Sequence, residues 1–269
     1  MNNTKSILAV LLSAASLAGM SSCTVWEARW GLPSTCIVDM TEFVEYGSAF
    51  DLNVWDSTQE EPETHLTHKT RDEIAEPFLA DVPRNIIGWS FITSSKTNAV
   101  RGHDLIYGEV PDRLFADCGS ANASQETSAI TGEPFNQSAR VKILLSEDSG
   151  LDLSSLRAVI HSTSIGLDMR SLTPIPGQHD YTKPVDTNGE LDFYMYRQVD
   201  YSETIDIYSS LDDSLRITIE LGKFLESQDY LWTDRNLRDI SLKVFITRTG
   251  VHIDVLPWEG DEDGDIIDV

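Results

Sequence analysis

The stretch ISLKVFITRTGVHIDVLP, residues 240–257, contains two alternating runs separated by Thr249-Gly250. In the first run apolar residues occupy every second position, at Ile240, Leu242, Val244 and Ile246. A period of two in β-branched residues is typical of a strand with one buried face. A glycine-containing pair between two such runs predicts a β-hairpin with a tight turn. The C-terminal part of the chain is therefore expected to be built from paired strands.

The same alternation extends backward through the second half of the chain. In ARVKILLS (139–146), Val141, Ile143 and Leu145 share one face. Four more runs show a similar pattern, at residues 156–163, 191–199, 203–209 and 214–221. Seven short strands bounded by Gly, Pro, Asn and Asp favour a β-sandwich. We therefore predict an all-β fold for this half.

One or two short helices are expected within this β fold. LGKFLESQDYLW (221–232) places apolar residues on one helical face. Thr70 followed by Glu73 has the spacing of a capping box, which predicts a short helix running towards Leu79. The preceding polar segment, residues 56–73, has the composition of a loop.

The first half of the chain is less regular. Strands are predicted at residues 36–40, 50–56, 85–93 and 104–108. Residues 119–138 are rich in small and polar side chains, which is typical of a domain boundary. These features divide the chain into a signal peptide, an N-terminal β domain, a C-terminal β-sandwich domain and an acidic tail, at residues 1–22, 23–130, 131–258 and 259–269.

The N-terminus has the features of an export signal that ends in a cysteine. Lys5 precedes an apolar run at residues 6–20, which is shorter than the roughly twenty residues that span a bilayer. Met20-Ser21-Ser22-Cys23 matches a bacterial lipobox, with methionine in place of the more usual leucine. We therefore expect Cys23 to be acylated (palmitate) and to tether the protein to the outer membrane, on its periplasmic or its outer surface. The alternative is ordinary secretion, in which Cys23 stays a free thiol.

The remaining two cysteines form an even pair if Cys23 carries lipid. Exported proteins fold in an oxidising compartment, where paired cysteines are common. A disulfide between Cys36 and Cys118 is therefore predicted, although sequence does not show whether the two residues meet.

The charge of the chain excludes one class of partner. Removing the signal peptide leaves 19 basic residues against 44 acidic ones, a net charge of about −25. Such a chain repels phosphate backbones, so we expect no nucleic-acid binding. It also repels anionic lipid surfaces, so contact with the membrane is expected through the lipid anchor alone.

The known catalytic and metal motifs are absent from the sequence. It contains no nucleophile elbow, zincin motif, dinucleotide fingerprint or phosphate-binding loop. His65 and His68 have helical spacing for a shared metal but lack a third ligand. The acidic run at 259–265 lacks the glycine and glutamate of an EF-hand loop. We therefore expect no metal and no cofactor, while a glycosidase pair among the 44 acidic residues stays open, since nothing in the sequence singles out one pair.

The residues at the C-terminal end also carry a family resemblance. LGKFLESQDYLWTDRNLRDISLKVFITRTGVHIDVLPWEG (221–260) has the order helix, polar link, strand, turn, strand and tryptophan. This order resembles the C-terminal region of fimbrial anchor and fimbrillin-like lipoproteins of Bacteroidales-type bacteria (the type V pilus subunit superfamily). The opening is also similar, with a lipid cysteine followed some dozen residues later by a second cysteine, as Cys23 and Cys36 are here.

The resemblance implies a fold and a role. The fold is two transthyretin-like β-sandwich domains, and the role is that of a non-enzymatic anchor or accessory subunit of a fimbrium (pilus) in cell adhesion. Partners would be other fimbrial subunits bound by strand exchange, in which a strand of one subunit completes the open sheet of another. Two alternatives stay open: a surface lipoprotein that binds a glycan or another ligand, and, with weaker support, a secreted hydrolase.

The acidic tail, EGDEDGDIIDV (259–269), ends in apolar residues. A merely solvated tail does not need Ile266, Ile267 and Val269. Two interpretations remain: a disordered terminus, or a short donor strand that docks on a sheet edge by β-augmentation.

Overall fold

The computed structural model describes residues 34–39, 41–43, 49–56, 64–80, 86–93, 97–122, 126–147, 153–247 and 250–255. These described residues form one compact unit. The described part is mostly β-strand arranged in four sheets, with two short α-helices, so the prediction of an all-β sandwich fold is confirmed.

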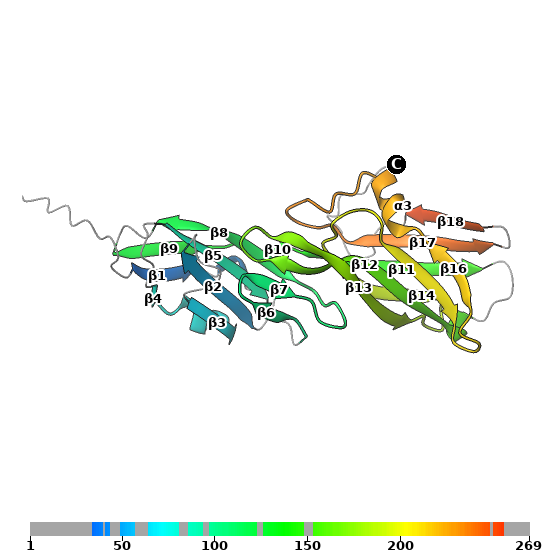
Figure 1. Ribbon diagram of the computed structural model, residues 1–269, viewed down its shortest axis with the longest axis horizontal. Helices are drawn as coiled ribbons and strands as arrows, with labels where there is room; N and C mark the ends of the chain where they lie inside the picture. Colours follow the sequence, from blue (N-terminus) through cyan, green and yellow to red (C-terminus); the bar gives the residue numbers. More distant parts are fainter. Residues whose placement is uncertain are drawn as a thin grey trace, which may run out of the picture. The chain divides into compact units, whose positions relative to one another are not determined.

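Two of the sheets are built from the first half of the chain (Figure 1). Sheet A has the order β4-β1-β9, and sheet B has the order β10-β8-β5-β2-β3. Their strands are β1 (Ser34–Asp39), β2 (Phe50–Asp56), β3 (Thr64–Lys69), β4 (Phe78–Ala80), β5 (Ile86–Thr93), β8 (Phe115–Asn122), β9 (Thr127–Thr131) and β10 (Phe135–Asn136). A 3-10 turn (Thr41–Phe43) and helix α2 (Arg71–Ala75) complete this half.

The facing sides of sheets A and B enclose one hydrophobic core. Cys36, Val38 and Ile130 of sheet A pack with Phe50, Leu52, Val54, Ile87, Trp89 and Phe91 of sheet B. Helix α2 adds Ile74 to this core, and the capping box predicted at Thr70 is formed, because Glu73 N donates to Thr70 Oγ1 and Thr70 N donates to Glu73. Full burial of one such side chain contributes about 1.5–3 kcal/mol, so this core is a major source of stability.

The other two sheets come mainly from the second half of the chain. Sheet C has the order β16-β15-β12-β7-β6, with β13 also paired to β12, and sheet D has the order β14-β11-β17-β18. Their strands are β6 (Ala99–Arg101), β7 (Asp104–Ile106), β11 (Ser138–Glu147), β12 (Leu156–Asp168), β13 (Thr173–Pro184), β14 (Glu190–Tyr196), β15 (Thr204–Ser209), β16 (Leu215–Ile219), β17 (Ile240–Thr247) and β18 (Gly250–Val255).

Sheets C and D enclose the larger core, and helix α3 (Leu221–Ser227) packs at its border. The alternating residues Val141, Ile143 and Leu145 all lie in this core, as the sequence predicted. The predicted hairpin of residues 240–257 is also present, since Leu242 to Thr247 of β17 pair antiparallel with Val255 to Gly250 of β18.

Strand β12 connects the two halves of the chain. Its first part, Leu156 to His161, pairs with β15, and its last part, Gly166 to Asp168, pairs with β7. The hairpin β6–β7 from the first half is thus part of sheet C. A third core cluster, which includes Trp55, Leu105 and Tyr196, extends this connection from sheet B to β14.

Several details of the sequence predictions are wrong. Residues 56–73 are not all loop, because β3 and the start of α2 lie there. Residues 119–138, which have the composition of a domain boundary, contain the end of β8 together with β9 and β10. The predicted helix 221–232 ends at Ser227, since the chain turns at Asp229, whose φ is 53°.

Candidate functional site

Strand β13 forms a free edge of sheet C, since among the described strands it pairs with β12 alone. An exposed edge is a template for unwanted strand pairing, and prolines or irregular pairing blunt it. Here Pro174, Pro176 and Pro184 lie at the two ends of β13, and the pairing with β12 shifts register near Ser164. The middle of the strand, residues 178–183, contains no proline and keeps an accessible edge.

A pocket of about 470 Å³ lies against this proline-free middle of β13. One wall is the segment that follows β7, and the other wall is β13 itself. The lining residues are Tyr107, Gly108, Glu109, Val110, His179, Asp180, Tyr181 and Thr182. The pocket is therefore bounded by aromatic rings, by two carboxylate side chains and by the backbone of a strand edge.

Two buried polar atoms border the pocket, Tyr107 Oη and His179 Nδ1, and neither has a hydrogen-bond partner among the described residues. Burial raises the pKa of Tyr107 and lowers the pKa of His179, so both rings are neutral near pH 7. The Tyr107 ring stacks on Tyr196 at a centroid distance of 3.9 Å. Since Tyr107 and Tyr181 are 7% and 5% exposed, their faces are covered, and the pocket offers polar contacts rather than an open stacking platform.

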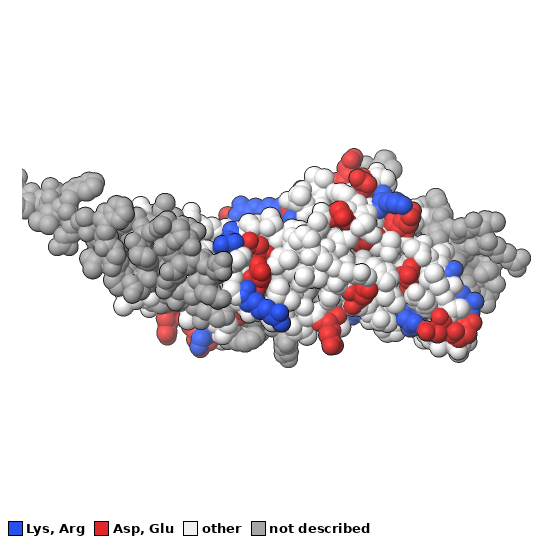
Figure 2. Space-filling view, viewed as in Figure 1, with Lys and Arg blue, Asp and Glu red and all other residues white. Residues whose placement is uncertain are grey.

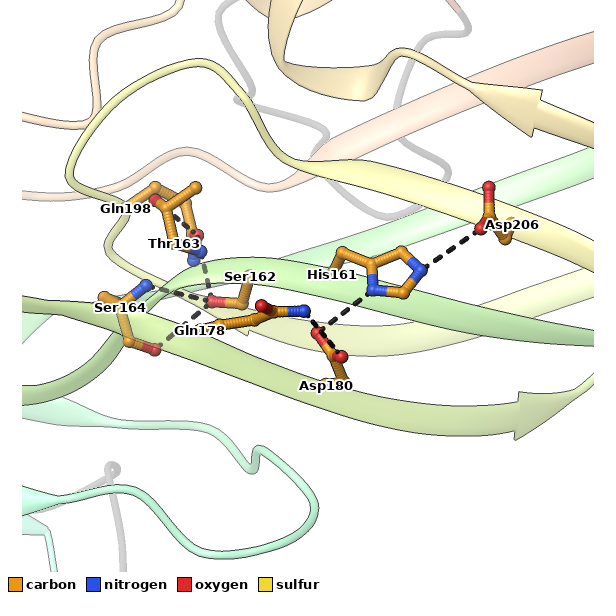
Figure 3. A network of polar contacts seen from close by, with 8 residues as sticks. All are labelled: His161, Ser162, Thr163, Ser164, Gln178, Asp180, Gln198 and Asp206. Carbon is orange, nitrogen blue, oxygen red and sulfur yellow. Dashed lines mark hydrogen bonds and ion pairs between the residues drawn. The ribbon is translucent and has the colours of Figure 1, made fainter.

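Next to the pocket, a polar network centred on His161 crosses sheet C (Figure 3). His161 of β12 lies between two carboxylates, with Nδ1 3.0 Å from Asp180 Oδ1 and Nε2 3.3 Å from Asp206 Oδ2. Gln178 donates to Asp180, and Thr218 donates to Asp206. The network links β13, β12, β15 and β16 across the partly exposed face of the sheet, and it supplies one pocket residue, Asp180.

A second free edge belongs to β18, which pairs with β17 alone among the described strands. It contains no proline within Gly250–Val255. The residues that were expected to form a donor strand, Ile266, Ile267 and Val269, lie outside the described residues, as do Trp258 and the rest of the tail. The signal peptide and Cys23 also lie outside them. These expectations therefore remain predictions.

The expected disulfide between Cys36 and Cys118 is absent, since both are free thiols. Cys36 packs in the core between sheets A and B, beside Trp89. Cys118 stands opposite Ser90 in sheet B, one position away from Trp89, so it points to the other face of that sheet. Sheet B separates the two sulfur atoms, and for this reason the prediction from cysteine parity is wrong.

Neither thiol has the environment of a reactive cysteine. Burial raises the pKa of Cys36 to about 11. Burial, with a further contribution from the negative charge of Asp117, raises the pKa of Cys118 to about 11 as well. Both thiols are therefore protonated at neutral pH, which makes them poor nucleophiles.

Two other patterns in the sequence have a structural explanation. His65 and His68 lie in strand β3 and not on a helix, so the helical spacing on which a shared metal site would depend is absent. Trp55, Trp89 and Trp232 are buried in the cores, so their rings are not open to a ligand.

The surface charges are mixed rather than gathered in one field. Figure 2 shows acidic side chains scattered among basic ones on the face in view, with uncharged surface between them. The net charge of −24 therefore does not produce a single acidic surface on that face. Within the described ranges, no helix has the length and hydrophobicity needed to cross a membrane.

No protein-family model and no curated protein sequence matches the chain. Solved structures do match it. The fimbrial anchor protein Mfa2 from Porphyromonas gingivalis aligns with a TM-score of 0.60 and 10% identity, over 83% of this chain and 98% of that one. A candidate adhesin from Bacteroides ovatus aligns with a TM-score of 0.58 and 12% identity, over 86% of this chain and 97% of that one.

A candidate polysaccharide-binding protein from Bacteroides thetaiotaomicron also has this fold, with a TM-score of 0.57 and 11% identity over 84% of this chain and 98% of that one. The resemblance drawn from the C-terminal sequence is thus confirmed: the structural neighbours include a fimbrial anchor protein and candidate adhesins of Bacteroidales. At these identities the likeness establishes the fold.

No pattern in the sequence predicted the pocket. Its two walls, residues 107–110 and 179–182, are about seventy positions apart and meet only because β7 and β13 flank the same central strand. Tyr107 was placed at the end of a predicted strand, and His179 and Tyr181 lie in β13, which was not predicted at all.

Proposed function

We propose that this chain is a cell-surface component of a fimbrial adhesion system, acting as an anchor or accessory subunit and not as an enzyme. The observation that carries the proposal is the shared architecture with the fimbrial anchor Mfa2, which extends over 98% of that chain. Candidate adhesins with the same fold support the same class of role.

The proposal includes a lipid anchor on Cys23. The support is the sequence alone: a basic residue, an apolar run of signal-peptide length and two small residues immediately before the cysteine. Acylation at this point would hold the protein at the outer membrane without any membrane-spanning helix. Two acyl signals are generally needed for stable anchoring, and a bacterial lipoprotein cysteine carries more than one chain.

Association with other subunits is proposed to use strand addition. The free edge of β18 supports this proposal, because an unpaired strand offers backbone N–H and C=O groups to an incoming segment. The tail that follows, with Ile266, Ile267 and Val269, is the proposed donor. By contrast, the prolines on β13 restrict pairing at that edge to its middle.

A second candidate function is binding of a glycan or another small polar ligand. The specific observation in its favour is the pocket beside β13, which places the carboxylate-bearing Glu109 and Asp180 near the unpartnered Tyr107 Oη and His179 Nδ1. Hydroxyl-rich ligands match such a set of donors and acceptors. A glycan array probed with the purified protein and with Glu109→Gln tests it, and binding that Glu109→Gln leaves unchanged would argue against this pocket.

The main proposal is tested in the native host by fractionation, intact-mass spectrometry and co-purification. We expect the mature protein to begin at an acylated Cys23, to fractionate with the outer membrane and to co-purify with fimbrial material. Cys23→Ala should release it from the membrane fraction, while the control Cys118→Ala should leave its location unchanged. Deleting residues 264–269 should reduce co-purification. An unmodified Cys23, or fimbrial association that is insensitive to the deletion, contradicts the anchor and the donor strand respectively.

A further inference from the structure

A cluster of three metal-ligating side chains lies where the hairpin β6–β7 joins the end of β12. It consists of His103, Asp104 and Asp168, whose ligand atoms all lie within 4.8 Å of one another. His103 Nε2 is 3.5 Å from Asp104 Oδ1 and 3.9 Å from Asp168 Oδ2. Ligands of a tetrahedral Zn²⁺ at about 2.0–2.2 Å lie roughly 3.3–3.6 Å from one another, so contraction of each ligand–ligand distance by at most about 1.4 Å would close the site.

The backbone holds the three residues in place before any ion binds. Asp104 is paired directly with Asp168 across β7 and β12. Met169 N donates to the carbonyl of His103 at 2.8 Å, which ties the hairpin turn to the end of β12. The turn itself consists of Gly102 and His103 between Arg101 and Asp104, and Gly102 has a φ of 60°, which glycine adopts without strain.

The electrostatics of the cluster favour a cation. Two aspartates directly opposite each other on adjacent strands repel, which destabilises the pairing of β7 with β12. Arg170 compensates one of them, since its backbone N donates to Asp168 Oδ1 at 2.8 Å and its Nη2 lies 3.3 Å from Asp168 Oδ2. The same contacts orient the Asp168 carboxylate towards His103 and Asp104.

We propose that His103, Asp104 and Asp168 bind one divalent transition-metal ion, with Zn²⁺ preferred. One imidazole nitrogen and two carboxylates suit Zn²⁺ better than Ca²⁺, which takes six or more oxygen ligands. The cluster is only partly buried, with side chains 24–37% exposed, so water completes the coordination. The ion fastens the hairpin β6–β7 from the first half of the chain to sheet C.

A second cluster of one histidine and two aspartates, formed by His161, Asp180 and Asp206, serves as a control. There the two carboxylates contact different nitrogens, Nδ1 and Nε2, on opposite sides of the ring (Figure 3). One ion cannot bind both carboxylates and a single imidazole nitrogen in that arrangement. Both clusters contain one histidine and two aspartates, so composition alone does not distinguish them, and the difference lies in the geometry.

The test is metal titration of the tag-free, full-length protein after treatment with EDTA and desalting. Calorimetry with ZnCl₂ should show a site that Asp104→Asn weakens by about 100-fold, since loss of even an outer partner of a metal ligand costs about 10–100-fold. At a hundredfold excess over Kd, Zn²⁺ should raise Tm by roughly 5–10 °C. MnCl₂ should bind more weakly than ZnCl₂, and CaCl₂ more weakly still.

The variants separate binding from folding. Without metal, Asp104→Asn should be as stable as the unmodified protein or more so, because it removes the repulsion from Asp168. His161→Gln should keep the full response to Zn²⁺. Hydrogen exchange of residues 99–106 should slow on addition of Zn²⁺. The proposal is overturned if Zn²⁺ does not raise the Tm of the unmodified protein. It is also overturned if the rise in Tm survives in Asp104→Asn or is lost in His161→Gln.

Discussion

Substituting Glu203→Gln should make the unfolding free energy depend less on pH, because Glu203 is a buried carboxyl. Its side chain is 1% exposed. One oxygen, Oε1, accepts a hydrogen bond from Trp232 Nε1 at 2.8 Å. The other, Oε2, has no partner among the described residues. Burial is the main cause that raises the pKa of this carboxyl from 4.5 to about 7.

The sign of the effect follows from proton binding. Below pH 4.5 the carboxyl is protonated in both the folded and the unfolded state. Between pH 4.5 and about 7 the unfolded state loses the proton first, so the free energy of unfolding falls as pH rises. Above pH 7 the carboxyl is ionised in both states, and the folded protein bears the full free-energy cost of the buried charge. Converted at about 1.36 kcal/mol per pH unit, the difference between the two pKa values corresponds to about 3 kcal/mol.

Glutamine is neutral at every pH and keeps an oxygen for the bond from Trp232. Its amide nitrogen replaces the partnerless Oε2, which costs about 1 kcal/mol as an unsatisfied donor. The variant should therefore be less stable than the unmodified protein by about 1 kcal/mol at about pH 3.5, where the carboxyl is protonated in both states, and more stable by about 2 kcal/mol at pH 8.5. The sign of the difference should change between these two values.

Urea unfolding at a series of pH values measures the difference in unfolding free energy between Glu203→Gln and the unmodified protein, provided that the two proteins give equal m-values. The control is Glu220→Gln, an exposed carboxylate in a surface ion pair with Lys223, which should change stability by less than about 1 kcal/mol at any pH. A difference between Glu203→Gln and the unmodified protein that stays constant from about pH 3.5 to pH 8.5 would refute the reasoning.

Three further substitutions test other parts of the structure. Arg197→Met should lower the free energy of unfolding by about 3–5 kcal/mol in urea, because Arg197 is buried and donates to Gln137 Oε1 and to the carbonyls of Trp232 and Asp234. Thr70→Ala removes the N-cap of α2 and should lower the free energy of unfolding by about 1 kcal/mol in the same assay. The far-UV circular dichroism spectrum of the folded protein should stay unchanged. Gly108→Ala places a Cβ against the backbone of Thr97, closer than van der Waals contact allows, and the resulting shift should lower the free energy of unfolding by about 1–3 kcal/mol and weaken any ligand binding at the pocket.

The sequence predicted strands best where one face is buried and the other is solvated. β11, β15 and β17 have that pattern and were found close to their predicted bounds. β13 was missed because it is an edge strand with prolines and polar residues, and just one of its twelve positions is fully buried. β8 was missed because its second half, Gly119 to Asn122, has the small polar composition of a linker.

The candidate sites were less predictable than the strands, because they depend on pairings far apart in sequence. Asp104 and Asp168 come together through the pairing of β7 with β12, and no spacing rule relates their positions. The disulfide prediction failed for a related reason. Cysteine parity says nothing about which face of a sheet each sulfur occupies, and that is what separates Cys36 from Cys118.

Because both halves of the chain pair with β12, the stability of each half depends on the other. Sheet C needs β7 to cover the last part of β12, where Leu167 and Met169 are fully buried beside residues of the first half. Tyr196 of β14 adds to this junction, because its hydroxyl donates to Asp112 Oδ1 at 2.7 Å and accepts from Asp112 N at 3.1 Å. Cutting the chain near residue 130 would expose these apolar side chains and leave β12 half unpaired. The two sandwiches therefore depend on each other for stability, which suits a protein whose proposed role is to hold a filament at a cell surface.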